Sequence, residues 1–259
     1  MTRMPAVFLG HGNPMNTLEH NVYTDAWHEL GQSLPRPRAV LAVSAHWYTR
    51  GVGVTAMAQP RTIHDFSGFP PELFAVEYPA PGDPQLATEV AGLVGAAAES
   101  GPVGLDDSWG LDHGTWSVLA HVYPDADVPV VQLSIDGTRD PDWHWDLASL
   151  LAPLRDDGVL VLGSGNIVHN LGRISWGSNQ PADWNLRFDE HVRDALDADD
   201  RHALTHYLDH PDGALACPTP EHYLPALYVA ALREADEPIS TVVAGYDLGS
   251  LSMRSFRVG

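Results

Sequence analysis

Short apolar runs, several of them rich in β-branched residues, recur along the chain and predict buried strands. They cover residues 6–9, 39–43, 128–133, 159–162 and 241–244. Several runs are continuous rather than alternating, which is typical of strands buried on both faces of a sheet. Longer stretches between them are predicted to be helical, at residues 17–34, 84–99, 143–155, 184–206 and 220–235. This alternation predicts an α/β fold, a single domain with a central, largely parallel sheet flanked by helices.

Two of these helices have recognisable starts. Asp83-Pro84 and Thr219-Pro220 each resemble a capping residue followed by proline in the first turn. The segment 62–84 is rich in proline, glycine and aromatic residues and has little periodicity, so we expect it to form a wall or lid of a pocket. The chain has no internal repeat and no linker, so residues 1–259 are expected to form one domain.

Composition narrows the classes of partner. The formal net charge is −20 and all 14 basic residues are arginine. This charge disfavours nucleic acid and anionic membranes as partners, because binding them requires clustered cations. There is no leader-like segment and no apolar stretch long enough to span a membrane, so we expect a cytoplasmic protein. Because Cys217 is the only cysteine, any metal site must use histidines and carboxylates.

Four histidines lie close to the ends of apolar runs or the start of a helix. His11 follows the first run by two residues and His46 follows the second by three, while His169 comes shortly after the run at 159–162. His222 is expected in the first turn of the helix after Pro220. Ligands of open α/β sheets bind where strand ends converge, and three imidazoles can hold a divalent metal with positions left open. Taken singly, each histidine also fits a core or capping role.

Seven short motifs are spread in order over nearly the whole chain. They are Gly-His-Gly-Asn-Pro-Met at 10–15, Ser-Ala-His-Trp at 44–47, Ile-His-Asp-Phe-Ser-Gly-Phe-Pro at 63–70, Tyr-Pro-Ala-Pro-Gly at 78–82, Gly-Leu-Asp-His-Gly-Thr-Trp at 110–116, Gly-Ser-Gly-Asn-Ile-Val-His-Asn at 163–170 and Pro-Glu-His-Tyr-Leu-Pro at 220–225. Together these motifs resemble one enzyme family, the 4,5-DOPA extradiol dioxygenases of the class III ring-cleavage group. Asn-Leu after the histidine at 169 favours the bacterial branch.

The resemblance implies roles for five histidines. His11, His46 and His222 would be metal ligands. His169 would lie beside the metal, either as the acid/base of ring cleavage or as a fourth ligand when zinc is bound. His113 is the other acid/base candidate, with Asp112 as a candidate to orient its ring, although His113 also fits a residue at a helix start.

The implied reaction inserts O2 into a small aromatic diol, a catechol such as DOPA. It would use one divalent metal per chain, with Fe(II) for turnover and Zn(II) as a metal the protein also binds. Ferrous oxygenases typically use two histidines and one carboxylate, whereas His222 stands where the carboxylate would be. Glu221, next to His222, would supply the carboxylate ligand only if the family's ligand position falls one residue earlier in this sequence. A zinc-dependent hydrolase and a nonenzymatic binding protein on the same fold are the alternative functions.

Other histidines are interpreted as surface residues. His202, His206 and His210 have four-residue spacing, which would place them on one helix face, but the neighbouring Arg201 and Asp209 suit a solvated surface.

Overall fold

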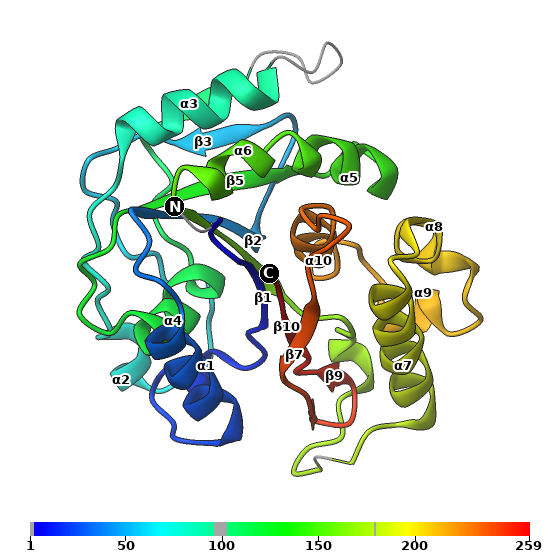
Figure 1. Cartoon of the computed structure of the whole chain (residues 1–259). Coiled ribbons are helices and arrows are strands. Elements are labelled where there is room, and N and C mark those ends of the chain that lie inside the picture. Colours follow the sequence, from blue (N-terminus) through cyan, green and yellow to red (C-terminus); the bar gives the residue numbers. More distant parts are fainter. Residues whose placement is uncertain (1–2, 96–102, 179) are drawn as a thin grey trace.

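An eight-stranded sheet forms the centre of the computed structural model, which describes residues 3–95, 103–178 and 180–259 (Figure 1). The strand order is β4-β3-β5-β2-β6-β1-β10-β7. Neighbours from β5 to β1 pair in parallel, as do β3 and β4, whereas β3–β5, β1–β10 and β10–β7 are antiparallel. The predicted α/β fold with a largely parallel sheet is confirmed. The strands are β1 Ala6–Gly10, β2 Ala39–Thr49, β3 Gly53–Thr55, β4 Gly104–Asp106, β5 Val130–Asp136, β6 Val159–Gly165, β7 Ile239–Val243 and β10 Ser255–Val258.

The continuous apolar runs became the central strands. β1, β5 and β6 are buried along their whole length, as expected for strands covered on both faces. The end predicted for β2 is wrong, because this strand continues to Thr49 and resumes its pairing with β5 at Tyr48 after a register shift. His46 therefore lies inside β2 and not after it.

Helices cover both faces of the sheet (Figure 1). α1 and α4 pack on one face around Trp27 and Trp116, whereas α3, α5, α6, α7 and α10 pack on the other. Successive residues of β1 supply the two cores in turn, with Val7 in the first and Phe8 in the second, because side chains alternate across a strand. The helices are α1 Val22–Ser33, α2 Pro71–Phe74, α3 Pro84–Gly95, α4 His113–Val122, α5 Pro141–Ser149, α6 Ala152–Asp156, α7 Asp183–Ala198, α8 Arg201–Thr205, α9 Gly213–Ala216 and α10 Leu224–Ala230.

Local capping chemistry explains where several helices begin. Asp83 accepts hydrogen bonds from the backbone of Gln85 and Leu86 at the start of α3, as predicted. The end predicted for this helix, residues 96–99, lies outside the described residues. α1 begins later than predicted because Asn21 forms a capping box with Thr24.

The other predicted helices differ in their bounds. The stretch 143–155 divides into α5 and α6, and 184–206 divides into α7 and α8 at Asp199, whose backbone is left-handed with φ of 56°. The prediction that a helix begins at Pro220 is wrong, because residues 220–223 form turns and α10 begins at Leu224. His222 therefore lies in the turn before α10. No described helix is long and apolar enough to cross a membrane.

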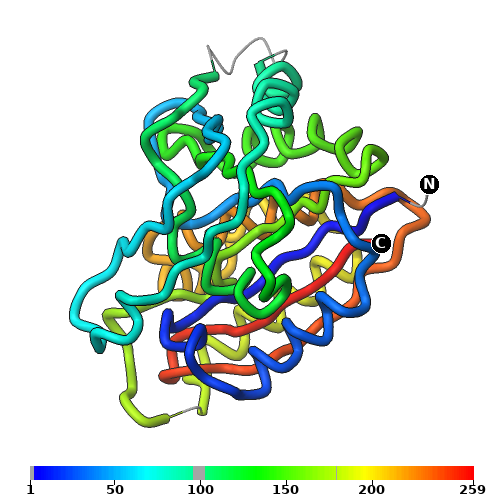
Figure 2. Tube along the Cα trace, turned by 90° about the vertical axis from the view of Figure 1, so that its left-hand side faces the viewer, coloured from blue at the N-terminus to red at the C-terminus, as the bar shows by residue number. Residues whose placement is uncertain are grey.

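Two elements close to the candidate site were not among the predicted helices and strands, although the alternative that His113 lies at a helix start is confirmed by α4. α4 is buried on almost every side, so its sequence lacks the polar face that marks a surface helix. β10 pairs antiparallel with β1, and the two strands run side by side in Figure 2 (red and blue). The small strands β8 Tyr246–Asp247 and β9 Leu251–Ser252 precede β10 and bring Leu251 to His169 through an isolated bridge.

Candidate metal centre

A cavity of about 340 Å³ lies where the parallel strands end. His11 follows β1 directly, and its backbone N–H donates to the carbonyl of Gly165, the last residue of β6. All five histidines singled out from the sequence line this cavity. They are His11, His46, His113, His169 and His222.

His11, His46 and His222 form a compact group of nitrogen donors. One ring nitrogen from each lies within 4.8 Å of those of the other two. The Nε2 atoms of His11 and His46 are 3.2 Å apart. Two imidazoles bound to one ion at metal–nitrogen distances of about 2.1 Å reach this separation at an angle of about 100°. His11 and His46 therefore have the spacing that one metal ion requires, and His222 lies close enough to complete a group that could hold it.

The hydrogen bonds of Ser164 define the tautomer of His11. The Ser164 hydroxyl donates to the carbonyl of Gly114 at 2.5 Å, so its oxygen is left to accept from His11 Nδ1, 3.0 Å away. With the proton on Nδ1, the lone pair of Nε2 points to the other two histidines. Such outer hydrogen bonds orient metal-binding imidazoles.

Carboxylates lie behind the other two rings. Asp65 Oδ2 is 3.4 Å from His46 Nδ1, and Glu221 Oε1 is 3.2 Å from His222 Nδ1. Each of the three candidate ligands thus has an oxygen beside Nδ1, which leaves Nε2 for a metal. Glu221 contacts the back of His222, which does not support the alternative in which it replaces that histidine as the ligand.

Burial keeps these imidazoles neutral. It lowers the pKa of His11 and of His222 well below the ordinary value, and the neighbouring histidines add to the effect. Burial, followed by the proximity of His113, also lowers the pKa of His46. The neutral ring is the form that binds metal. The donor set therefore fits a divalent ion with nitrogen ligands.

His169 and His113 flank this group. The His169 ring stacks on His222 with centroids 3.5 Å apart and an angle of 6°, outside the three-histidine group. Burial lowers the pKa of His169 to about 4. His113 is the first residue of α4, and its ring centroid lies 3.8 Å from that of His46. Both rings are close enough to meet a ligand bound at the three histidines.

Two glycines allow this close packing. A Cβ on Gly114 would lie 2.4 Å from Ser44 Oγ and 2.8 Å from His46 Cδ2. A Cβ on Gly165 would lie 2.1 Å from the carbonyl oxygen of His222. A side chain at either position would push a candidate ligand away, so only glycine lets α4, β2, β6 and the turn before α10 meet here.

A family model supports the interpretation of this site. The model for the catalytic LigB subunit of aromatic ring-opening dioxygenase matches residues 5–253. The chain belongs to this family. Its members are dioxygenases that open aromatic rings and use a metal, so the resemblance found from the sequence motifs is confirmed at this level.

Relatives agree with the family match. A protein of Escherichia coli (strain K12) named 4,5-DOPA dioxygenase extradiol is 52% identical, covering 100% of this chain and 96% of its own. A Beta vulgaris protein of the same name is 34% identical over 96% of this chain and 94% of its own. A crystal structure of an uncharacterized Escherichia coli K12 protein has a TM-score of 0.86 at 48% identity, covering 99% of this chain and 100% of that one.

The role suggested for Asp112 is wrong. Asp112 caps α4, and its carboxylate accepts hydrogen bonds from Ser44 and Gln132. Among the described residues, these partners do not include the His113 ring. Asp65 takes that place. Its Oδ1 lies 2.9 Å from His113 Nδ1 and accepts from the His113 backbone N–H at 2.9 Å. Burial acts to raise the pKa of Asp65, but the contact with His113 outweighs it and lowers the pKa.

Asp65 was not singled out from the sequence, although its motif was. It belongs to Ile-His-Asp-Phe at 63–66, in the segment expected to wall the pocket. Phe66 and Phe69 of the same segment do line the cavity, which confirms the expectation of a wall. The signal in the sequence was the carboxylate of Asp65 next to Phe66, in the segment that was expected to form a wall of the pocket.

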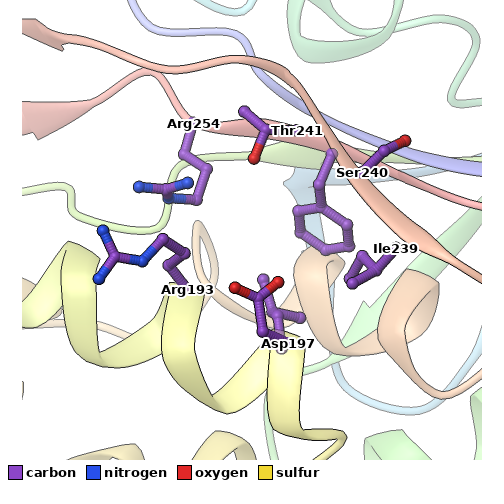
Figure 3. Close-up of a pocket in the computed structure, with 8 residues that line it drawn as sticks. Arg193, Asp197, Ile239, Ser240, Thr241 and Arg254 are labelled. Carbon is purple, nitrogen blue, oxygen red and sulfur yellow. The ribbon is translucent and has the colours of Figure 1, made fainter.

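A second hollow, between α7, β7 and β10, is of a different kind. Figure 3 shows Arg193, Asp197 and Arg254 around it, and its volume is only about 10 Å³, room for about one water. Arg254 forms two hydrogen bonds with Asp189, and Arg193 is paired with Asp194. The arginines are engaged with carboxylates, so this hollow offers no site for a substrate.

Proposed function

We propose that residues 1–259 form a single catalytic domain that opens catechol rings by extradiol cleavage, with His11, His46 and His222 holding one divalent metal ion. The observation that carries this proposal is the convergence of three neutral imidazoles on one end of an apolar cavity, each with an oxygen beside Nδ1. DOPA is the first catechol to test, because a bacterial relative and a plant relative are both named for it.

When bound, the metal supplies a centre at which the two catechol oxygens and O2 come together and through which electrons pass from ring to oxygen. The chain supports this in two ways. Three neutral ligands leave positions open for these groups. The apolar walls, with Phe66 and Phe69 among them, hold the ring and limit the entry of water.

Proton transfer is assigned to His169 and His113. A catechol bound as its anion must lose a phenolic proton, and a neutral imidazole close to the metal-facing nitrogens can accept it. His113 has Asp65 beside Nδ1, which favours a proton on Nδ1 and leaves Nε2 as the atom that would accept a proton from the substrate. His169 lies on the other side of the group, stacked on His222. We assign the removal and the return of protons during ring opening to these two rings.

Metal reconstitution tests the proposal. The metal-free protein is loaded anaerobically with Fe(II) or with Zn(II), and oxygen uptake and the yellow ring-opened product are then followed with DOPA and simpler catechols. We expect both signals with Fe(II) and neither with Zn(II). Absence of Fe(II)-dependent ring opening with every catechol would reject the dioxygenase, and hydrolysis without oxygen uptake would favour the zinc hydrolase.

A His169→Gln variant separates the two roles of His169. As an acid/base, its loss abolishes turnover while the metal content stays at one ion per chain. As a fourth ligand, its loss also lowers the zinc content. His202→Gln, an exposed histidine on α8, is the matched control and should change neither quantity.

A further inference from the structure

The wall of the cavity away from the histidines is apolar. It is formed mainly by two short segments, the aromatic loop around Phe66 and the loop that follows His169, with contributions from β9 and the turn before it. Apart from Asn13 and the indole N–H of Trp176, the side chains here carry no polar group, and Asn13 accepts a hydrogen bond from the Met15 backbone. The apolar side chains are those of Pro14, Phe66, Phe69, Leu171, Ile174, Trp176, Leu248 and Leu251.

This wall has no charged side chain that could pair with a positive or a negative group of a ligand. Among the described residues that line the cavity there is no arginine, aspartate or glutamate, and the chain has no lysine. Arg173 lies on the loop after His169 but is exposed and outside the lining. Asp65 and Glu221 contact the backs of His113 and His222 and do not line the cavity.

The mouth of the cavity is apolar as well. Trp176 is 81% exposed and Leu171 is 59% exposed, although both line the cavity. Large apolar side chains left open to solvent beside a cavity are typical of a surface that a ligand covers. The net charge of −20 further opposes the approach of an anionic ligand.

We propose that this cavity selects catechols whose ring substituent is uncharged and apolar, in preference to catechols that carry a carboxylate or an amino acid side chain. The inference rests on the proposed function for where the ring lies, with its two oxygens at the histidines. A charge one to three bonds from that ring would then lie against apolar side chains such as Phe66 and Ile174 without a counter-charge, which is unfavourable.

Three ligands of similar size test the preference. They are 4-propylcatechol, 3-(3,4-dihydroxyphenyl)propionate, which has a carboxylate in place of the terminal methyl group, and DOPA. Binding is measured anaerobically by calorimetry to Zn(II)-loaded and to metal-free protein, so that no turnover is needed. We expect 4-propylcatechol to bind the Zn(II)-loaded protein at least about tenfold more tightly than either charged ligand. Equal or tighter binding of a charged ligand, or no binding of 4-propylcatechol, overturns the proposal.

A charge-introducing variant sharpens the test. Trp176→Arg places a cation at the mouth, and Trp176→Gln removes the same aromatic ring without adding charge. Because the Trp176 side chain is largely exposed, both variants should fold. We expect Trp176→Arg to bind the propionate about two- to fivefold more tightly than Trp176→Gln does. No difference between the two variants contradicts an uncompensated charge as the cause of discrimination.

Failure of the proposed function gives a different pattern. If no catechol is opened with Fe(II) while 4-propylcatechol still binds more tightly than the propionate, the apolar preference stands and the dioxygenase proposal falls. If rings are opened but the propionate and DOPA are the better ligands, the dioxygenase stands and the apolar preference falls.

Discussion

Histidines occur in two contrasting settings in this protein. In the cavity, His11, His46 and His222 each have an oxygen beside Nδ1, and one ring nitrogen of each lies within 4.8 Å of those of the other two. His144, on α5, is also buried, but both of its nitrogens are engaged. Nδ1 lies 2.9 Å from the Tyr228 hydroxyl and Nε2 lies 3.2 Å from the carbonyl oxygen of Asp136.

His202 on α8 and His206 directly after it differ from the cavity histidines in another way. Their ring centroids are 4.1 Å apart, nearly as close as those of His46 and His113 at 3.8 Å. Both side chains are exposed, however, and His206 Nε2 lies 3.7 Å from Asp142. Proximity alone and burial alone therefore do not mark a metal site. What distinguishes the cavity group is burial combined with one free nitrogen on each of three converging rings.

The largest expected effect comes from removing one of those free nitrogens. His46→Ala should lose bound metal, with affinity reduced more than about 100-fold, beyond what the loss of an outer hydrogen-bond partner costs. His202→Ala should bind metal as the unaltered protein does. Metal content after dialysis, and competition with a chelator, measure both. Retention of one tightly bound ion by His46→Ala would contradict its role as a ligand.

The strands and the positions of four histidines were predictable because the signal is local. Apolar runs at 6–9 and 159–162 mark β1 and β6 directly, and polar residues after such runs lie at a sheet edge. His46 was assigned to this edge by the same rule, although β2 continues past it. It still reaches the site because its strand lies between β5 and β6 and its ring approaches His11.

The contacts that prepare the histidines were not predictable from spacing. Asp65 and His113 are 48 residues apart, and Ser164 and His11 are 153 residues apart, so only tertiary packing shows that they meet. α4 was missed because burial removed its polar face, and Asp112 was assigned to His113 because the two are adjacent in sequence. Adjacent side chains diverge, whereas a carboxylate from a distant loop fills the position.

Asp65→Asn is expected to have the second largest effect. Asparagine keeps an oxygen that can accept from the His113 backbone but loses the charge beside the rings of His46 and His113. Metal affinity or the rate of ring opening should fall by about 10- to 100-fold, as for other carboxylates behind metal-binding histidines. Asp142→Asn, beside the exposed His206, is the matched control and should leave both unchanged. Equal effects of the two changes would show that Asp65 does not position these rings.

His144 should show its effect in the pH dependence of stability instead. Burial lowers the pKa of His144 to about 4, so the unfolded chain binds more protons than the folded protein between about pH 6.5 and 4. Stability is therefore lost as the pH falls through this window, by about 1.5 kcal/mol between pH 6.5 and 5 from this residue. His144→Gln should remove that part of the slope without changing metal content.

The measurement is urea unfolding of the metal-free protein at several pH values. Using the difference between His144→Gln and the unaltered protein cancels the contributions of the cavity histidines, which lie in a separate region. Identical pH slopes would mean that His144 takes up a proton in the folded state, against its two hydrogen-bond partners.

The smallest effect is expected at His206. Its side chain is 43% exposed and its contact with Asp142 is an exposed ion pair even when the ring is protonated. His206→Ala should change the free energy of unfolding by less than about 0.5 kcal/mol and leave metal content unaltered. Urea unfolding and metal analysis check both. A loss of metal in this variant would mean that an ion binds at α8. Two exposed imidazoles would then be enough to hold a metal, and burial of three converging rings would not distinguish the metal site.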